Sequence, residues 1–435
     1  MVLSKVMDAK TKQEKRIKPD LPGGFRDYGH SDTIAKQDMM DSIRRTFESF
    51  GFDPLQTASV QRTEVLTGGD EDSGKIIFNV KGSRDEESSS SLRFDLTVPL
   101  ARFLAAHPEV PKQFKRYQIG TVWRGESPQA GRYREFIQAD VDIVGTASID
   151  ADLEIVLVLY TALKELGIEN FTIAYNNRKI LNALPKFAGF PEEKLWGVLR
   201  SIDKMDKIGK EKVLEEIGEE FGNETSGKID TYLEQDMSTD MDFIAICDGL
   251  KMLKIDVDTY FVQKTSLVRG LSYYTGMVVE ATLTDAPEIG SIGGGGRYDD
   301  LVTQFTGQSI AAVGVSIGVD RLFAALEKLG ILQKKTTKTH VLIMQLSESL
   351  SPEYLKMAQE LRKSGINTAL YLGEDRTFQA QLAYAVKKEI PFVVIYGPDE
   401  AERGVIQIKN LKTREQTEVP KEKVQEFLTN QKESR

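Results

Sequence analysis

The sequence predicts an α+β protein, in which a large sheet-containing domain with a helical insertion precedes a smaller α/β domain. Three observations lead to this prediction. The chain has 435 residues, which is too long for one ordinary hydrophobic core. Strand-like and helix-like runs are mixed up to about residue 330, and a regular strand–helix alternation begins only after residue 339.

The first elements are read from periodicity and from residues that end helices. SDTIAKQDMMDSIRRTFESFG predicts a helix that Ser31 or Asp32 caps and Gly51 ends. FDPLQTASV looks extended. KRYQIGTVWRGE and RYREFIQADVDIVG predict two strands, joined by the turn-forming SPQAG. Helices follow at DLEIVLVLYTALKELG and across the acidic stretch 190–255, so we place a helical insertion at about 180–260.

The remaining elements divide the chain into its predicted domains. RGLSYYTGMVVEAT looks extended, the glycine-rich GSIGGGGRYDD follows, and GVDRLFAALEKLG predicts a helix. We expect the first domain to span 1–332 and the charged QKKTTKT at 333–339 to be a linker. HVLIMQL, PEYLKMAQELRKSG, INTALYL, FQAQLAYAVKK and PFVVIYG then alternate strand and helix, which predicts a second domain at 340–435 with a partly parallel sheet.

The composition excludes several classes of protein and of site. One cysteine rules out an intramolecular disulfide and fits a reducing cytoplasm. Three scattered histidines argue against a histidine-based metal site and against a Ser-His-Asp triad. No apolar run approaches the ~18 residues of a membrane span, and MVLSKVMDAKTKQEKRIK lacks the apolar core of a secretory signal. We therefore expect a cytoplasmic protein without a membrane partner.

Charge is distributed unevenly along the chain. The net charge is −9, and residues 200–260 hold eight basic and sixteen acidic residues. Residues 111–134, by contrast, hold six basic residues and one acidic residue. A basic stretch in an acidic chain suggests an anionic ligand at a defined site, although a solvated basic surface fits the same counts.

Arg269 is the most unusual side chain in the pattern. It lies in LVRGLSYYTGMVVEA, which otherwise reads as the start of a buried strand. A guanidinium does not lose its proton in proteins, so burial without an anionic partner would cost several kcal/mol. The sequence therefore predicts that an anion meets Arg269.

Alternate residues of the two predicted strands would share one face. On that face we expect Gln118, Gly120, Val122, Arg124 and Glu126 from the first strand, and Arg134, Phe136, Gln138, Asp140 and Asp142 from the second. Such a face could line a cleft, and a solvent-facing hairpin fits the pattern equally well.

Three shorter patterns add candidates. Asp95 and Thr97 would also share a face if extended, and a carboxylate beside a hydroxyl suits an ammonium group, although a capping pair is the simpler interpretation. Four consecutive glycines at 293–296 match neither a P-loop nor a dinucleotide fingerprint; they allow close approach of a ligand, or form a flexible loop. Arg321 is predicted near the start of its helix.

The order and spacing of these motifs resemble the histidyl-tRNA synthetases, which are class II aminoacyl-tRNA synthetases. RGESPQAGRYREF resembles motif 2 of that class, and VGVSIGVDRL resembles motif 3. LVRGLSYYTG resembles the histidine-specific signature Arg-Gly-Leu-Asp-Tyr-Tyr. The resemblance runs from LPGGFRDY to the C-terminal domain, and implies a class II antiparallel sheet flanked by helices, followed by an anticodon-binding-like domain.

The resemblance implies a role for each matching residue. ATP would be bound by Arg124, Glu126, Arg132, Phe136 and Arg321, with Phe136 stacked on the adenine and Glu126 at the adenine or at a Mg²⁺ ion. L-Histidine would be bound through its amino group by Asp95, Thr97 and Gln138, and through its imidazole by Asp142, Tyr273 and Tyr274. Arg269 would reach the α-phosphate and the substrate carboxylate, and would act with Arg124 and Arg321 in catalysis.

The implied reaction is adenylate formation followed by transfer to tRNA(His). It needs no side-chain nucleophile, because fixed guanidiniums and Mg²⁺ stabilise the charge that builds on the phosphate oxygens. The resemblance also implies a homodimer. A tRNA acceptor end would enter near Ser127 to Gly131, and the candidates for anticodon contacts are Arg376, Lys387 and Lys388. The acidic insertion would cover the acceptor stem only if Lys204, Lys207, Lys210 and Lys212 form one face.

Three residues depart from the family pattern. Ser272 replaces the Asp of the signature, Ala58 replaces the motif 1 proline, and Asp300 replaces a common glycine. The signature assigns Arg269 and Tyr274 to one pocket although a regular strand would separate them, so we expect a bulge at Gly270.

Two other classes of protein share parts of this pattern. One is a regulatory subunit of an ATP phosphoribosyltransferase, which resembles the synthetase core but lacks the C-terminal domain and usually the signature arginine. The other is a non-catalytic sensor of tRNA or amino acid. Arg269 and residues 339–435 argue against the regulatory subunit, and Arg124, Arg269 and Arg321 argue against the sensor, as does the lack of a kinase signature.

Overall fold

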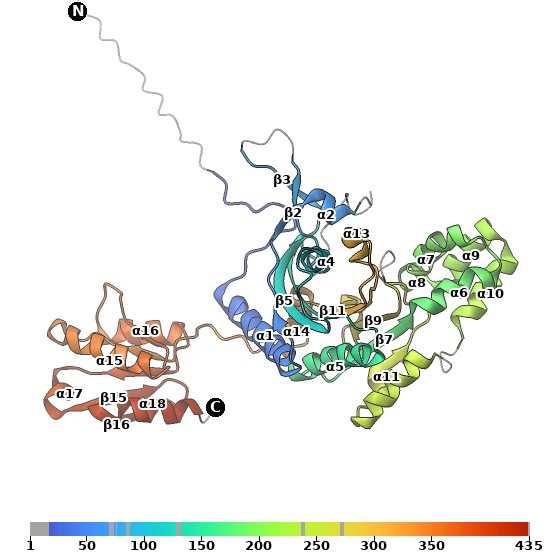
Figure 1. Ribbon diagram of the computed structural model, residues 1–435. Helices are drawn as coiled ribbons and strands as arrows, with labels where there is room; N and C mark the ends of the chain where they lie inside the picture. The colour runs from blue at the N-terminus through green and yellow to red at the C-terminus, as the bar shows by residue number, and fades with distance from the viewer. Residues whose placement is uncertain are drawn as a thin grey trace, which may run out of the picture.

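The computed structural model describes residues 17–68, 74, 76–83, 88–127, 132–235, 240–269 and 274–433. Its centre is a curved eight-stranded sheet with the order β1-β5-β6-β11-β10-β9-β7-β8 (Figure 1). The edge pairs β1–β5 and β7–β8 are parallel and the five central pairs are antiparallel. The strands are β1 Asp53–Pro54, β5 Phe114–Trp123, β6 Glu135–Val144, β7 Phe171–Asn177, β8 Phe261–Gln263, β9 Met277–Leu283, β10 Ser291–Arg297 and β11 Ala312–Gly318.

Helices and the main hydrophobic core cover one face of this sheet. Helices α1 His30–Ser49, α5 Ile149–Glu165 and α14 Val319–Lys328 pack here, together with α11 Met241–Met252 and α12 Val257–Tyr260. The three long helices were predicted, but the predicted cap of α1 is wrong. Its N-cap is Gly29 without a side-chain hydrogen bond, and Ser31 and Asp32 lie inside the first turn.

The opposite face of the sheet carries smaller elements. Helix α4 Thr97–Ala106 packs there on Val144 and Tyr298, beside the three-stranded sheet β2-β4-β3. The remaining elements of this layer are β2 Val60–Arg62, α2 Thr63–Thr67, β3 Phe78–Val80, β4 Ser90–Leu92 and α13 Thr303–Thr306. Polar side chains of β5 and β6 point to this face, so the candidate site lies here.

The glycine run forms a central strand, so the flexible-loop interpretation is wrong. Gly293 to Gly296 lie within β10, paired on both sides to β9 and β11. A Cβ at Gly294 would stand 2.4 Å from Arg269 Nη1, and one at Gly296 would stand 3.2 Å from the ring of Tyr274. The glycines therefore make room for side chains of the site on one face of the sheet.

A helical region built largely from residues 178–233 has a hydrophobic core of its own. It contains α6 Arg178–Ala188, α7 Leu195–Ile202, α8 Met205–Ile208, α9 Lys210–Phe221 and α10 Asn223–Leu233. Val268, one residue before Arg269, is buried in the same core. Lys210 forms ion pairs with Asp230 at 2.5 Å and Glu234 at 2.6 Å, so its charge is compensated within this region.

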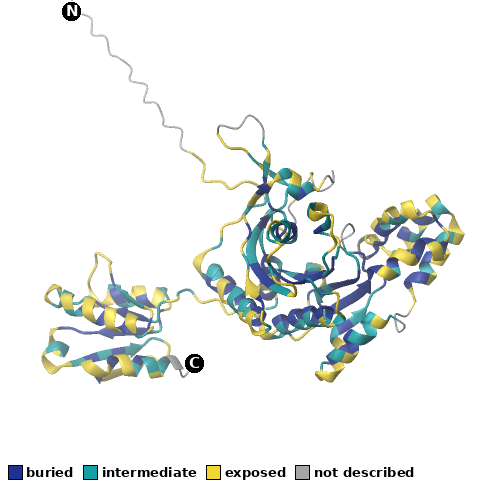
Figure 2. Cartoon of the chain, viewed as in Figure 1, coloured by how far each residue is buried: buried dark blue, intermediate teal, exposed yellow. Residues whose placement is uncertain are grey.

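A five-stranded sheet of order β13-β12-β14-β15-β16 forms the C-terminal part, with parallel pairs at β12–β13 and β12–β14. The predicted alternation is confirmed, and Figure 2 shows its buried strands beneath exposed helix surfaces. Its elements are β12 Val341–Ile343, α15 Ser351–Lys363, β13 Thr368–Leu370, α16 Phe378–Lys387, β14 Phe392–Ile395, α17 Pro398–Arg403, β15 Val405–Asn410, β16 Gln416–Pro420 and α18 Val424–Glu433.

The α+β fold class predicted from the sequence is confirmed. The seven residues 333–339 connect the two parts without regular structure. None of the helices that the structure describes is long and apolar enough to span a bilayer.

Candidate active site

Arginines from three parts of the chain gather at one end of the β5–β6 hairpin. Arg124 follows β5, Arg132 precedes β6, Arg321 is the third residue of α14, and Arg269 lies ahead of β9. Burial and the charges of the other three arginines lower the pKa of Arg321 to about 10. Four guanidiniums that disfavour one another's charge form a site for an anion with several negative charges.

Hydrogen bonds to the backbone fix two of these arginines. Arg124 Nε donates to the carbonyl of Phe94 at 3.0 Å, and its guanidinium lies 5.1 Å from the ring centre of Phe136. Arg321 Nη1 donates to the carbonyl of Ser291 at 2.6 Å. As far as the described residues go, the other guanidinium nitrogens remain available for phosphate-type oxygens, which Arg binds in a fork geometry.

Glu280 is the anion that meets Arg269 within the chain. Arg269 Nη1 donates to Glu280 Oε1 at 2.8 Å, to Ser291 Oγ at 2.5 Å and to the carbonyl of Gly293 at 3.2 Å. The arginine side chain is 37% exposed and lies ahead of β9, so its predicted place inside a buried strand is wrong. These three contacts anchor Nη1 of Arg269, and its other guanidinium nitrogens can face a ligand.

Three buried carboxylates lie deeper between the strands. Asp140 and Asp142 project from β6, and Asp95 lies just before α4. Desolvation raises the pKa of Asp95 to about 6 and that of Asp140 to about 7, and it also raises the pKa of Asp142. Their counter-charge is Arg116, which is fully buried and lies 2.6 Å from Asp142 Oδ2.

Each predicted histidine-site residue that the structure describes has a defined position. Asp95 Oδ1 accepts from the Val98 backbone N–H at 3.2 Å and Thr97 begins α4, so the predicted strand face is wrong here and capping is observed for Asp95. Gln138 Nε2 donates to Ser316 Oγ at 2.7 Å. Gln138, Asp140 and Asp142 are each at most 9% exposed, which excludes a solvent-facing hairpin at these positions.

The remaining candidates lie around this centre or outside the described residues. Phe136 is half-buried beside Arg124, Tyr274 packs against the small core under α4, and Glu126 and Arg132 are exposed. Tyr273, Ser272 and the bulge expected at Gly270 lie outside the described residues, as do residues 128–131 of the SPQAG turn.

The described residues contain no group of three His, Cys, Asp or Glu side chains arranged to hold a metal ion. Glu126 is exposed, and Glu280 is already paired with Arg269. Mg²⁺ keeps several waters and is commonly bound by one or two carboxylates together with substrate phosphates. The donor set therefore fits a Mg²⁺ ion that arrives on a phosphate ligand, and it does not fit a resident metal cage.

Sequence reasoning did not single out Arg116, Glu280 or Asp320. Asp320 accepts hydrogen bonds from Lys36 Nζ at 2.5 Å, the Tyr28 hydroxyl at 2.6 Å and the Ile137 backbone N–H at 2.6 Å. It therefore fixes the start of α14, next to Arg321, against β6. A charged residue within an apolar run, as Glu280 is in MVVEATL, is the signal that could have found that partner.

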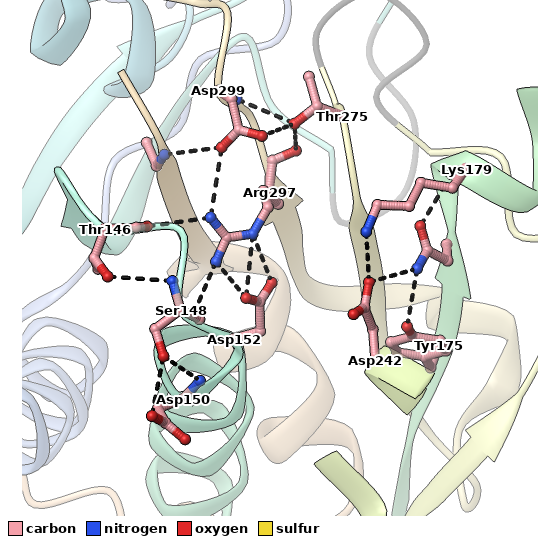
Figure 3. A network of polar contacts seen from close by, with 12 residues as sticks. Thr146, Ser148, Asp150, Asp152, Tyr175, Lys179, Asp242, Thr275, Arg297 and Asp299 are labelled. Carbon is pink, nitrogen blue, oxygen red and sulfur yellow. Dashed lines mark hydrogen bonds and ion pairs between the residues drawn. The ribbon is translucent and has the colours of Figure 1, made fainter. Parts of the chain in front are cut away.

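A second polar network holds the chain just before β9 (Figure 3). Arg297 Nε donates to both oxygens of Asp152, at 3.2 and 3.1 Å, and its backbone carbonyl accepts from the Thr275 N–H at 2.8 Å. Thr275 Oγ1 donates to Asp299 Oδ2 at 2.7 Å. Thr275 adjoins Tyr274, so the network ties this side of the site to α5 and β10.

Comparisons with known proteins give one consistent result. A family model described as histidyl-tRNA synthetase matches residues 24–322, and one described as an anticodon binding domain matches residues 340–431. A histidine–tRNA ligase of Wolinella succinogenes is 41% identical over 432 aligned residues, covering 93% of this chain and 96% of its own.

Solved structures agree with this result. A histidyl-tRNA synthetase from Nostoc sp. PCC 7120 has a TM-score of 0.85 at 32% identity and covers 96% of this chain and 100% of its own. A protein from Bacillus halodurans, described as an ATP phosphoribosyltransferase regulatory subunit/histidyl-tRNA synthetase, has a TM-score of 0.69 at 20% identity, covering 85% of this chain and 97% of its own. At that identity the second likeness shows a common fold only.

Proposed function

Because this chain belongs to the histidyl-tRNA synthetase family, we propose that it is a histidine–tRNA ligase, which uses ATP to join L-histidine to tRNA(His). The observation that carries this proposal is the meeting of two subsites of opposite charge. Four arginines form a site for polyphosphate, and buried carboxylates beside them form a site for an ammonium group and an imidazole.

In the first step, a carboxylate oxygen of histidine attacks the α-phosphorus of ATP. The bond from that phosphorus to the bridging oxygen breaks, and pyrophosphate leaves with the electron pair. In this proposal Arg269 contacts both the α-phosphate and the carboxylate, while Arg124, Arg132 and Arg321 bind phosphate oxygens. Guanidiniums held by Phe94, Ser291 and Glu280 need little reorganisation as charge develops on these oxygens.

The same pocket orients the two substrates. Phe136 stacks on the adenine, and Asp95, Thr97 and Gln138 bind the amino group of histidine. Asp142, Tyr273 and Tyr274 surround the imidazole. Hydrogen bonds to both ring nitrogens would select histidine, because any other side chain leaves buried polar groups unpaired.

Mg²⁺ bound to the ATP phosphates would neutralise part of their charge, and Glu126 is the carboxylate that we assign to the adenine or to the ion. In the second step, a hydroxyl of the terminal ribose of tRNA attacks the carbonyl carbon and AMP leaves. The acceptor end would enter beside residues 127–131, and the C-terminal domain at 340–435 would contact the anticodon.

We also propose a homodimer and a cytoplasmic location, the latter because Cys247 is the one cysteine and is a free, buried thiol. For anticodon contacts, Lys387 and Lys388 remain candidates, whereas Arg376 already lies 3.8 Å from Glu348 in an ion pair. Sedimentation velocity of the purified chain tests the dimer.

The test of the function is histidine-dependent ATP–pyrophosphate exchange, run in parallel with the other nineteen amino acids. We expect exchange with histidine alone, and a decrease in kcat/KM of roughly 10²- to 10³-fold in Arg269→Ala, the range for loss of one preorganised donor. Arg44→Ala is the matched control, because Arg44 is 43% exposed and pairs with Asp41 on the surface of α1.

Two results would contradict the proposal in different ways. Exchange that is equally fast in Arg269→Ala would remove the catalytic role of this arginine. No exchange with any amino acid, despite binding of ATP or histidine, would favour the regulatory or sensor class instead.

A further inference from the structure

Asp140 is a buried carboxylate that no described contact fully satisfies. It is 2% exposed, and its Oδ1 has no hydrogen-bond partner among the described residues; nor does Oε1 of Gln138, two residues earlier on the same face of β6. Both atoms are oxygens and therefore accept hydrogen bonds. Buried acceptors that find no donor among the described residues leave room for a donor from a bound ligand.

Ser316 on β11 connects these two side chains. Its hydroxyl accepts from Gln138 Nε2 at 2.7 Å, and Ser316 pairs directly with Asp140 across β6 and β11, where it lowers the pKa of that carboxyl. In the sheet, Asp140 lies opposite Gln118 on one side and Ser316 on the other. Ser316 thus lies between Asp140 and a group that binds Gln138.

The charges around Asp140 do not balance without a ligand. Carboxylates face it from β6 (Asp142) and from the segment before α4 (Asp95), and guanidiniums face it from β5 (Arg116) and from the end of β4 (Arg93). Asp142 takes the ion pair with Arg116, and Arg93 is turned to the backbone carbonyls of Thr57 and Thr121. Asp140 therefore lacks a dedicated positive partner.

We infer that Asp140 is a positioning residue that holds a proton while the amino-acid subsite is empty and releases it when the ammonium group of histidine binds beside Gln138. This inference rests on the proposed function. The exchange is balanced: the carboxylic acid loses one proton to solvent, and the substrate ammonium replaces that positive charge. The ionised Asp140 then orients Ser316, and through it the amide of Gln138, for the bound amino group.

The inference gives a pH dependence with a definite sign. Desolvation raises the pKa of Asp140 to about 7, so the free protein carries this proton below about pH 7. Histidine binding must then expel it, which weakens binding at low pH. Between pH 6 and pH 8, histidine affinity should rise about tenfold more in the wild type than in a variant without this proton.

The test is isothermal titration calorimetry of histidine in buffers that differ in ionisation enthalpy, which counts protons released on binding. Free histidine releases a proton of its own in this range, so wild type is compared with Asp140→Asn. At pH 6.5 the wild type should release about three-quarters of a proton more than the variant. At pH 8.5 the two should release the same number.

A second variant keeps the inference testable if Asp140→Asn does not fold. Ser316→Ala removes a hydrogen bond that favours the ionised carboxylate, so the pKa of Asp140 rises further. Proton release should then persist to higher pH than in the wild type, which is opposite to the effect of Asp140→Asn. Loss of packing alone would not shift proton release in this direction.

The outcomes separate the two proposals. Histidine binding with the same proton release in wild type and Asp140→Asn, or with no upward shift in Ser316→Ala, would overturn the inference and leave the synthetase function intact. Failure of the wild type to bind histidine at any pH would overturn the function and the inference with it.

Discussion

Removal of the Asp320 carboxylate is expected to destabilise this protein strongly. The carboxylate receives the Lys36 ammonium, the Tyr28 hydroxyl and the Ile137 backbone N–H, all within 2.6 Å. The side chains of Lys36 and Asp320 are 9% and 4% exposed, so the pair is buried. Asp320→Asn keeps the shape of the side chain and removes its charge.

The size of the destabilisation follows from the buried Lys36 ammonium, which Asp320→Asn leaves without its carboxylate. An unpaired buried charge costs about 3–5 kcal/mol. Lys36 keeps its contact with the face of the Tyr28 ring, 4.2 Å from the ring centre, which places the cost toward the lower end of this range. Weakening of two charge-assisted hydrogen bonds adds roughly 1 kcal/mol each. We therefore expect a loss of about 4–6 kcal/mol in the free energy of unfolding.

Tryptophan fluorescence during urea unfolding can measure this loss in the part of the chain before residue 333, which contains Asp320. The two tryptophans, Trp123 and Trp196, lie in β5 and in the helical region, and none lies in the C-terminal domain. A double-mutant cycle with Lys36→Met should give a coupling energy of about 3 kcal/mol.

Asp41→Asn is the matched control for this cycle. Asp41 pairs with Arg44 on the exposed face of α1, where such pairs contribute about 0–1 kcal/mol. A loss below 1 kcal/mol in Asp320→Asn, or a coupling energy near zero, would refute the reasoning. Because Arg321 follows Asp320, the KM for ATP should also rise more than the KM for histidine.

Three further predictions concern the same site. Gly294→Ala places a methyl group 2.4 Å from Arg269 and should slow exchange at least tenfold, whereas Gly197→Ala, with nothing within 4 Å, should be silent. Asn176→Ala removes hydrogen bonds of 2.9 and 2.8 Å to the segment before Arg269, and should speed amide hydrogen exchange there and raise the KM for histidine. Between pH 8 and pH 6 the wild type should gain about 1.4 kcal/mol of stability relative to Asp140→Asn, because the raised pKa stabilises the protonated folded state; equal slopes in urea unfolding would contradict this.

Elements with a clear period were predictable from the sequence. The apolar spacing in α1, α5 and α14 reflects one buried face in each helix, and a single buried face is what periodicity records. The alternation in β5 and β6 instead separates the apolar face under the helices from the polar face of the site, and residues of both faces are buried. The same holds for the alternating strands and helices after residue 339. Residue types were less informative about where a helix begins, because Ser31 and Asp32 suggested a cap for α1 whereas its N-cap is Gly29.

The missed features depend on residues far apart in the sequence. β10 has four glycines and therefore no side-chain pattern, yet its two neighbours pair with it along its length. Asp95 and Thr97 would share a face only in an extended chain, but Pro99 is tolerated in the first turn of a helix, so α4 begins at Thr97 and the simpler capping interpretation holds for Asp95. The partner of Arg269 is Glu280, and only the path of β9 brings the two together.

The charge pattern of the β5–β6 hairpin explains how an acidic chain can build a site for two anions. Its turn end carries Arg124 and Arg132, and Asp142 lies six positions after Phe136, which is about 20 Å at the rise of a strand. Along this distance the surroundings change from an excess of guanidinium to an excess of carboxylate. A polyphosphate would be stabilised at one end and an ammonium at the other, so an amino acid bound across the change in sign would direct its carboxylate toward the arginines. Summed charge over the segment 111–134 detected only the basic end, because the carboxylates follow later in β6 and their burial is a property of the fold.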